Sequence, residues 1–311
     1  MDIRYRERFT DAQITDYGRV QSLQAALCRR YPMLRTVTVG ASVLGRELNA
    51  LVLTPPDGVG PGTPRVLLAA AFHGQEWLTA LCALRLAEDI CLADSSRLPL
   101  CGLPIEAALR ERELWLLPMV NPDGVEIALY GSAAAGDYAA FAAANGGDTH
   151  GLWQANARGV DINHNFNAGW VEMQDLAKKI GRDRPGARQY SGESPESEPE
   201  TRALTDLCRR YAFRHVVALH SQGEEIYWSY GDATPPQSEI IARVLGAASG
   251  YTVTAPTGMA SYGGFKDWFI RCFRRPGFTI ELGRGVNPLP IGEFEAIYGK
   301  AQEMLLLSLF L

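Results

Sequence analysis

The stretch from Pro64 to Gly74, PRVLLAAAFHG, constrains the fold of this chain more than any other. Its apolar residues are continuous, whereas a strand with one solvent-exposed face alternates apolar and polar residues. Such a run predicts a strand that is buried on both faces. Because strands of that kind lie in sheets covered by helices on both sides, we expect this one at the centre of an α/β sheet.

Predicted strands and helices alternate along the rest of the chain. A helical pattern covers residues 12–31, and further helices are expected over about 77–92, from a cap at Ser197 onwards, and over about 291–309. The expected strands are RTVTVGAS, ELNALVLTP, ELWLLPMV, FRHVVALHS, YTVTAP and GFTIELG. This alternation predicts an α/β fold with helices on both faces of the sheet. Since no break in composition divides the 311 residues, we expect a single domain over 1–311.

Charge and hydropathy exclude several classes of protein. The net charge is −5 with both signs interspersed, so we expect no nucleic-acid partner, which would call for a basic stripe. No run approaches the roughly 18 apolar residues that span a bilayer. The first residues, MDIRYRERFTDAQITDYG, are charged and lack the apolar centre of a secretory signal, and the six cysteines form no CxxC pair. These features predict a cytoplasmic protein with reduced thiols.

The first chemically informative motif is FHGQEW, in which His73 and Glu76 follow the central strand. A tight turn at Gly74 can direct an imidazole and a carboxylate to one point, and both groups are suitable zinc ligands. The alternative is a polar strand end that simply leads into a helix, because a two-residue motif of this kind is common.

A catalytic zinc site needs a third protein ligand, and the candidates are His220 and His164. His220 ends a predicted strand, where α/β sheets place their sites, whereas His164 lies in GVDINHNFNAGW. His215 is five positions before His220 and therefore points to the opposite face of the strand, so we expect it to be structural.

Glu281 ends the apolar strand GFTIELG. A carboxylate there is costly unless it has a partner or a function. Near a zinc ion it could act as a general base, and otherwise it would pair structurally.

The ordered motifs HGQE, NPDG, GVDINHNFNAGW, ALHS and FTIELG resemble those of zinc carboxypeptidases of the carboxypeptidase A type (peptidase family M14). The resemblance covers about residues 16–311 and leaves 1–15 as an N-terminal extension. It implies a mixed sheet of about eight strands flanked by helices and one zinc ion per chain. It also implies that His73, Glu76 and His220 hold the zinc and that Glu281 is the catalytic base.

The resemblance implies roles for two further residues of GVDINHNFNAGW. Asp161 corresponds to the acid that hydrogen-bonds the first zinc histidine, and such a carboxylate fixes the imidazole tautomer. Asn163 corresponds to an asparagine that helps to bind the terminal carboxylate of the substrate.

Several positions depart from the family pattern. His164 stands where the family has an arginine that grips the free C-terminal carboxylate, and imidazole lacks the planar fork of that arginine. Gln154 replaces a basic residue that steadies the oxyanion, and Arg158 is the nearest arginine that could substitute for it. Met259 occupies the position of the mobile tyrosine of the family, and Tyr262 could replace it in part.

One position gains a charge. Lys266, in GGFKDW, falls where the family places the residue that sets side-chain preference on the leaving side of the bond. A lysine there favours a substrate carboxylate, although a solvated surface lysine is the alternative. Together with the altered clamp, it makes the chain similar to bacterial γ-D-glutamyl-meso-diaminopimelate peptidases, which cut cell-wall (murein) peptides.

We therefore predict a zinc peptidase that acts on murein peptides. The alternatives are a metallocarboxypeptidase that releases C-terminal acidic residues, a related deacylase, and a non-catalytic peptide-binding protein on the same fold.

Overall fold

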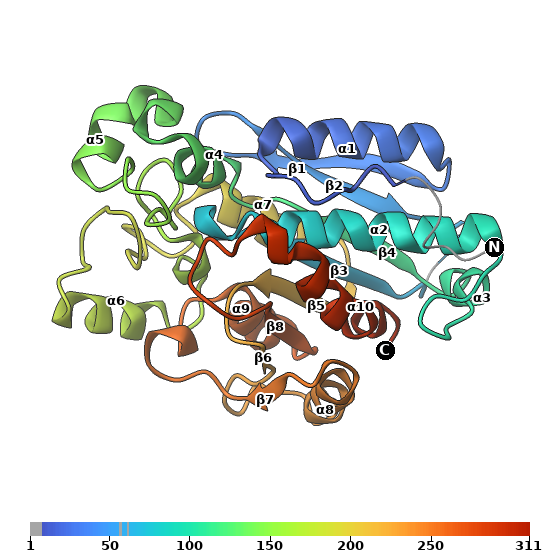
Figure 1. Cartoon of the computed structure of the whole chain (residues 1–311). Helices are drawn as coiled ribbons and strands as arrows, with labels where there is room; N and C mark the ends of the chain where they lie inside the picture. Colours follow the sequence, from blue (N-terminus) through green and yellow to red (C-terminus); the bar gives the residue numbers. More distant parts are fainter. Residues whose placement is uncertain (1–7, 56–57, 61) are drawn as a thin grey trace.

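The continuous apolar run after Pro64 forms β3 (Arg65–Ala70), which lies between β4 and β5 near the centre of the sheet. The computed structural model describes residues 8–55, 58–60 and 62–311. Over these residues it shows one eight-stranded sheet in the order β1-β2-β4-β3-β5-β8-β6-β7 (Figure 1). The other strands are β1 (Leu34–Ala41), β2 (Glu47–Leu53), β4 (Glu113–Leu117), β5 (Phe213–His220), β6 (Glu225–Tyr227), β7 (Thr252–Thr254) and β8 (Gly277–Glu281).

The sheet is mixed, and its central strands run in the same direction. β3 pairs in parallel with β4 and β5, and β5 pairs in parallel with β8. The pairs β1–β2, β2–β4 and β6–β8 are antiparallel. Because β3, β5 and β8 are parallel, the segments that follow them emerge at one edge of the sheet, which is where α/β proteins place their sites.

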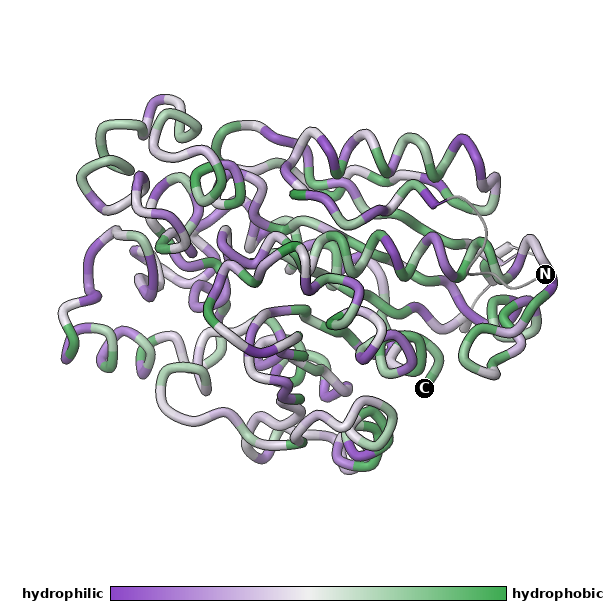
Figure 2. Tube along the Cα trace, viewed as in Figure 1, coloured by the Kyte–Doolittle hydropathy of each residue, from purple (hydrophilic) through white to green (hydrophobic). Residues whose placement is uncertain are grey.

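Alternate residues of β3 pack on opposite faces, as expected for a strand buried on both sides. Val66, Leu68 and Ala70 join the apolar cluster formed with α1 (Tyr17–Arg30), α2 (Leu78–Ser96) and α10 (Phe294–Phe310). Leu67 and Ala69 join a second cluster with α7 (Pro199–Arg210) and α9 (Phe265–Phe273). Figure 2 shows the hydrophobic stretches along the central strands between these helices.

A third apolar cluster holds the long connection that leads to the site. It joins α4 (Pro122–Tyr130), η3 (Ser132–Tyr138) and α5 (Ala139–Ala144) to the buried Trp153. The remaining helical elements are η2 (Gly74–Glu76), α3 (Ile105–Leu109), η4 (Ile162–His164), α6 (Trp170–Lys179), α8 (Gln237–Ser249), η5 (Gly258–Ser261) and η6 (Ile291–Glu293). The cluster anchors the polypeptide just before Asp161.

The predicted cap at Ser197 is wrong. α7 begins at Pro199 and its N-cap is Glu198, since proline at the first helical position has the backbone angle that a helix needs. The Ser197 hydroxyl instead donates to the Glu198 carboxylate and accepts from the Asn165 side-chain amide. Glu200, which is three residues after Ser197 and would complete a capping box with it, accepts the backbone N–H of Val43.

The N-terminal segment contacts α2 where it is described. The Thr10 backbone donates to Glu88 at 3.0 Å, and Arg8 pairs with Asp89 at 2.8 Å. Residues 1–7 of the expected extension lie outside the described residues. Among the described residues, no helix combines the length and apolarity needed to cross a bilayer.

All six cysteines are free. Cys82, Cys91 and Cys208 are buried, Cys28 is partly buried, and Cys101 and Cys272 are exposed.

Candidate active site

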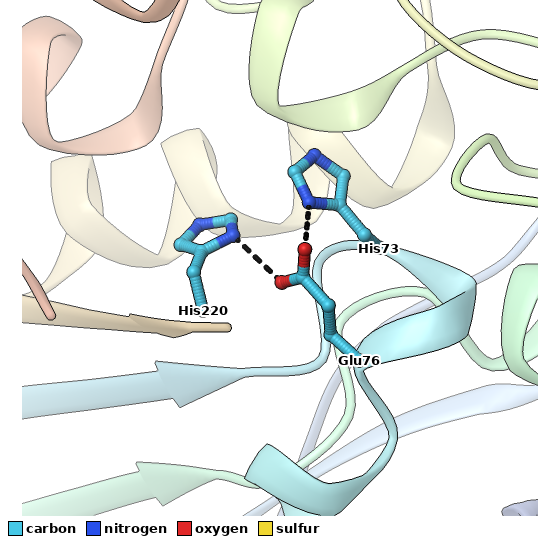
Figure 3. A group of neighbouring side chains, drawn as sticks. All are labelled: His73, Glu76 and His220. Carbon is cyan, nitrogen blue, oxygen red and sulfur yellow. Dashed lines mark hydrogen bonds and ion pairs between the residues drawn. The ribbon is translucent and has the colours of Figure 1, made fainter. Parts of the chain in front are cut away.

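His73, Glu76 and His220 converge at the carboxyl ends of β3 and β5. His73 precedes η2 and Glu76 ends it, so one short helical turn brings residues three apart to the same side. The Nδ1 atom of His73 lies 2.8 Å from one Glu76 oxygen, and the Nδ1 atom of His220 lies 3.0 Å from the other (Figure 3). Potential ligand atoms of the three residues all lie within 4.8 Å of one another.

The turn between His73 and Glu76 depends on Gly74. A Cβ atom at this position would lie 2.1 Å from the Gly124 carbonyl oxygen, which is far inside van der Waals contact. The Gly74 N–H also donates to the Gln154 carbonyl at 3.0 Å. A glycine is required here because the backbone of α4 and of the connection before Asp161 approaches so closely.

The cluster is buried and its electrostatics favour a cation. Burial alone would lower the pKa of His73, but the carboxylates of Glu76 and Asp161 raise it well above its ordinary value. Burial alone would raise the pKa of Glu76, but the two histidines lower it to about 2. A carboxylate held between two imidazoles is therefore ionised at neutral pH, and a metal ion can replace the proton that His73 carries.

The donor set of this cluster fits zinc. Two imidazole nitrogens and a carboxylate are the ligands of one common type of catalytic zinc site, which keeps a further position open. His73, Glu76 and His220 are the described residues that could hold such an ion. His215 takes no part, because its Nε2 donates to the Ser308 carbonyl at 2.6 Å in the core, as expected for a structural histidine.

Asp161 lies behind His73, away from Glu76. Its carboxylate accepts from His73 Nε2 at 3.1 Å and from the Gln189 backbone N–H at 3.0 Å, and it is 1% exposed. Burial alone would raise the pKa of Asp161, but His73 and His164 lower it. The ionised acid holds the Nε2 proton of His73, which leaves Nδ1 to face the cluster.

Glu281 ends β8 directly beside His220. The two residues are partners in the parallel β5–β8 register, and the Leu282 N–H donates to the His220 carbonyl at 2.8 Å. Burial and repulsion from Glu76 raise the pKa of Glu281 well above its ordinary value. A raised pKa makes a carboxylate a stronger base, which suits a group that takes up a proton and later returns it.

These side chains open into a cleft of about 190 Å³. Its walls include the sequence-predicted residues His73, Asp161, Asn163, His164, His220, Lys266 and Glu281. A larger cavity of about 490 Å³ lies at the opposite ends of β3 and β5 and includes Arg65, Arg214 and Arg275. Of these two cavities, the smaller one contains the candidate catalytic groups and is the one we assign as the active site.

His164 is not part of the His–Glu–His cluster. Its Nδ1 donates to the Tyr262 carbonyl at 3.0 Å, so the backbone of the neighbouring loop sets the orientation of the ring. Asn163 accepts the Phe265 N–H through Oδ1 at 3.1 Å, so its amide nitrogen is the end that can serve a substrate.

Two residues predicted to bind substrate, Arg158 and Tyr262, are not among the residues that line the cleft. The Arg158 side chain is 44% exposed and lies 3.7 Å from the Glu198 carboxylate. The Tyr262 ring packs close to Gly169, and Met259 lies in the cleft wall instead. A role in substrate binding for Arg158 and Tyr262 stays a prediction.

The cleft wall also includes polar residues that were not predicted as site residues, among them Gln154, Gln189, Tyr227 and Asp267. Gln154 and Gln189 come from irregular segments, and Tyr227 comes from β6, a strand of three residues that has no clear periodicity. Asp267 follows Lys266 in the motif GGFKDW, and the adjacent basic residue was the one signal in the sequence that could have identified it.

A mixed sheet with a His–Glu–His cluster and a strand-end glutamate at one edge defines a metallopeptidase. The chain belongs to the zinc carboxypeptidase family, since the model of that family (peptidase M14) matches residues 20–303. The eight-stranded mixed sheet flanked by helices that the resemblance implied is confirmed. The protein is therefore a metallopeptidase of the zinc carboxypeptidase family, as predicted.

Two relatives and one solved structure are similar to this chain. Gamma-D-glutamyl-L-diamino acid endopeptidase 1 of Lysinibacillus sphaericus is 36% identical over 95% of this chain and 72% of its own length. Carboxypeptidase B of Rattus norvegicus is 27% identical over 86% of this chain and 63% of its own length. The crystal structure of thrombin-activatable fibrinolysis inhibitor has a TM-score of 0.76 at 19% identity and covers 97% of this chain and 76% of its own, which shows the shared fold.

Proposed function

We propose that this metallopeptidase hydrolyses the amide bond between γ-D-glutamate and meso-diaminopimelate in murein peptides. The observation that carries the proposal is His164, which lies in the cleft wall where the family pattern has a carboxylate-gripping arginine. Because its Nδ1 is held by the Tyr262 carbonyl, it offers at most one nitrogen to a substrate. The relative from Lysinibacillus sphaericus, whose name describes a γ-D-glutamyl-L-diamino acid endopeptidase, supports this substrate class.

The residues of the cleft suit amide hydrolysis. A zinc ion held by His73, Glu76 and His220 would supply Lewis acidity that polarises the scissile carbonyl. Glu281 takes the proton of the attacking water on its carboxylate and returns it to the leaving amine. Asp161 keeps the His73 ring in the orientation that serves the cluster.

A substrate comparison tests the proposal. We expect hydrolysis of L-alanyl-γ-D-glutamyl-meso-diaminopimelate with a higher kcat/KM than that of an N-blocked peptide ending in glutamate. Cleavage of the second peptide alone would overturn the proposal in favour of a carboxypeptidase for acidic residues.

A variant of the base separates an enzyme from a peptide-binding protein. Glu281→Gln should lower kcat by about 10²–10⁴-fold and keep the zinc content, because Glu281 is expected to transfer protons and not to bind metal. Unchanged hydrolysis in this variant would refute the assignment of the base.

A further inference from the structure

Lys266 and Asp267 form a buried ion pair in the wall of the cleft. Their side chains are 3% and 2% exposed, and Lys266 Nζ contacts Asp267 Oδ1. Lys266 Nζ also donates to the Ser229 carbonyl at 2.7 Å, and the Asp267 carboxylate accepts from the Gly264 backbone. These contacts fix both charges at the start of α9, next to the catalytic edge of the sheet.

Fold stability does not account for this pair. Removing two charges from water costs free energy that their mutual attraction repays only in part, and apolar side chains often serve stability equally well. Burial raises the pKa of Asp267 although Lys266 opposes this shift, so one lysine does not fully compensate for the lost hydration. A second cation beside the Asp267 carboxylate would therefore stabilise its charged form further.

Both groups also keep bonding capacity toward a ligand. An ammonium group has three donors, of which Lys266 directs two to Asp267 and Ser229. A carboxylate has about four acceptor sites, and Lys266 and the Gly264 backbone use two of those on Asp267. A ligand that reaches the pair can thus meet one donor and up to two acceptor sites side by side.

We propose that the Lys266–Asp267 pair recognises a zwitterionic side-chain tip on the residue that is released, with Lys266 binding its carboxylate and Asp267 its ammonium group. This inference rests on the proposed function, and it adds which two residues recognise the two charges at the tip of the released side chain. A lone lysine would accept any carboxylate and a lone aspartate any ammonium. The pair has no net charge, so a tip with one charge leaves the other member of the pair unmatched in a buried site.

Three substrates that differ only in the released residue test this recognition. Each carries a γ-D-glutamyl bond to meso-diaminopimelate, to L-lysine (ammonium tip) or to L-2-aminopimelate (carboxylate tip). We expect kcat/KM for the meso-diaminopimelate peptide to exceed that for either other peptide by about 10²-fold or more, because buried polar groups without partners discriminate strongly.

Variants of each member assign the two charges. Lys266→Met should lower kcat/KM for the meso-diaminopimelate peptide by at least about tenfold and leave the lysine peptide much less affected. Asp267→Asn should likewise lower kcat/KM for the meso-diaminopimelate peptide and leave the 2-aminopimelate peptide much less affected. Lys178→Met, at an exposed position on α6, is the matched control and should behave like the wild type. Near-UV circular dichroism and zinc content establish that each variant is folded.

The outcomes separate this inference from the proposed function. Equal kcat/KM values for the meso-diaminopimelate and lysine peptides would overturn the inference and leave the proposed function standing. Hydrolysis of none of the three peptides, with cleavage of an N-blocked peptide ending in glutamate, would overturn both. If either variant fails to fold, the comparison of the three substrates with the wild-type protein still decides the inference.

Discussion

Asp161→Asn is the substitution whose effect the structure defines most fully. Asparagine keeps the size of aspartate but presents one acceptor oxygen and one donor nitrogen. Asp161 uses its two oxygens on two donors, His73 Nε2 at 3.1 Å and the Gln189 N–H at 3.0 Å. An asparagine can therefore accept from only one of them.

Either orientation of the new amide weakens the cluster. If its nitrogen faces His73 Nε2, the imidazole must carry its proton on Nδ1, the nitrogen that zinc requires. If its nitrogen faces the Gln189 N–H, two buried donors oppose each other, which costs about 1–3 kcal/mol. That cost falls on the stability of the fold, whereas the loss of such a hydrogen-bond partner typically weakens metal affinity by about 10–100-fold.

We expect the Asp161→Asn variant to bind zinc about 10–100-fold more weakly, as measured by competition with a chelator of known affinity. Activity at limiting zinc should fall and should return in part when zinc is added. Asp175→Asn, at an exposed position on α6, is the control for the loss of one negative charge. A zinc affinity within about twofold of the wild type would refute the role of Asp161 as the partner of His73.

Three more predictions follow from single contacts. Burial raises the pKa of Glu200 from 4.5 to about 8, so its contribution to stability is full below pH 4.5 and is lost as the pH rises to about 8. In the wild type the free energy of unfolding should therefore fall between pH 5 and pH 9, and Glu200→Gln should reduce this fall by up to about 5 kcal/mol, as measured by urea unfolding. An equal fall in the variant would exclude Glu200 as its source. His164→Arg should shift kcat/KM toward peptides with an ordinary free C-terminal residue, and an unmoved preference would make His164 a structural residue of its loop. Gly74→Ala should lower both the Tm and the zinc content, because its Cβ would meet the Gly124 carbonyl oxygen at 2.1 Å, whereas Gly299→Ala meets no atom within 4 Å and should do neither.

The sequence by itself determined the central strand, the alternation of strands and helices and the position of His73 and Glu76, three residues apart, just after the central strand. These features depend on local periodicity and on residues three positions apart, which backbone geometry alone brings together. The ends of β5 and β8 could likewise be found from their apolar runs, which placed His220 and Glu281 near strand ends. That these two ends meet at one edge follows from the parallel pairing of β5 with β8 in the structure.

Only the tertiary structure decided which polar residues meet. From the residues alone, His220 was the candidate for the third ligand with His164 as its rival; the structure places His220 Nδ1 beside Glu76 and His164 Nδ1 beside the Tyr262 carbonyl. Likewise, Ser197 stands in a sequence typical of a helix N-cap, but its hydroxyl accepts from the Asn165 side chain instead of capping the helix. Such contacts join residues 32 to 144 positions apart, and they depend on strand register and loop packing that local propensity does not encode.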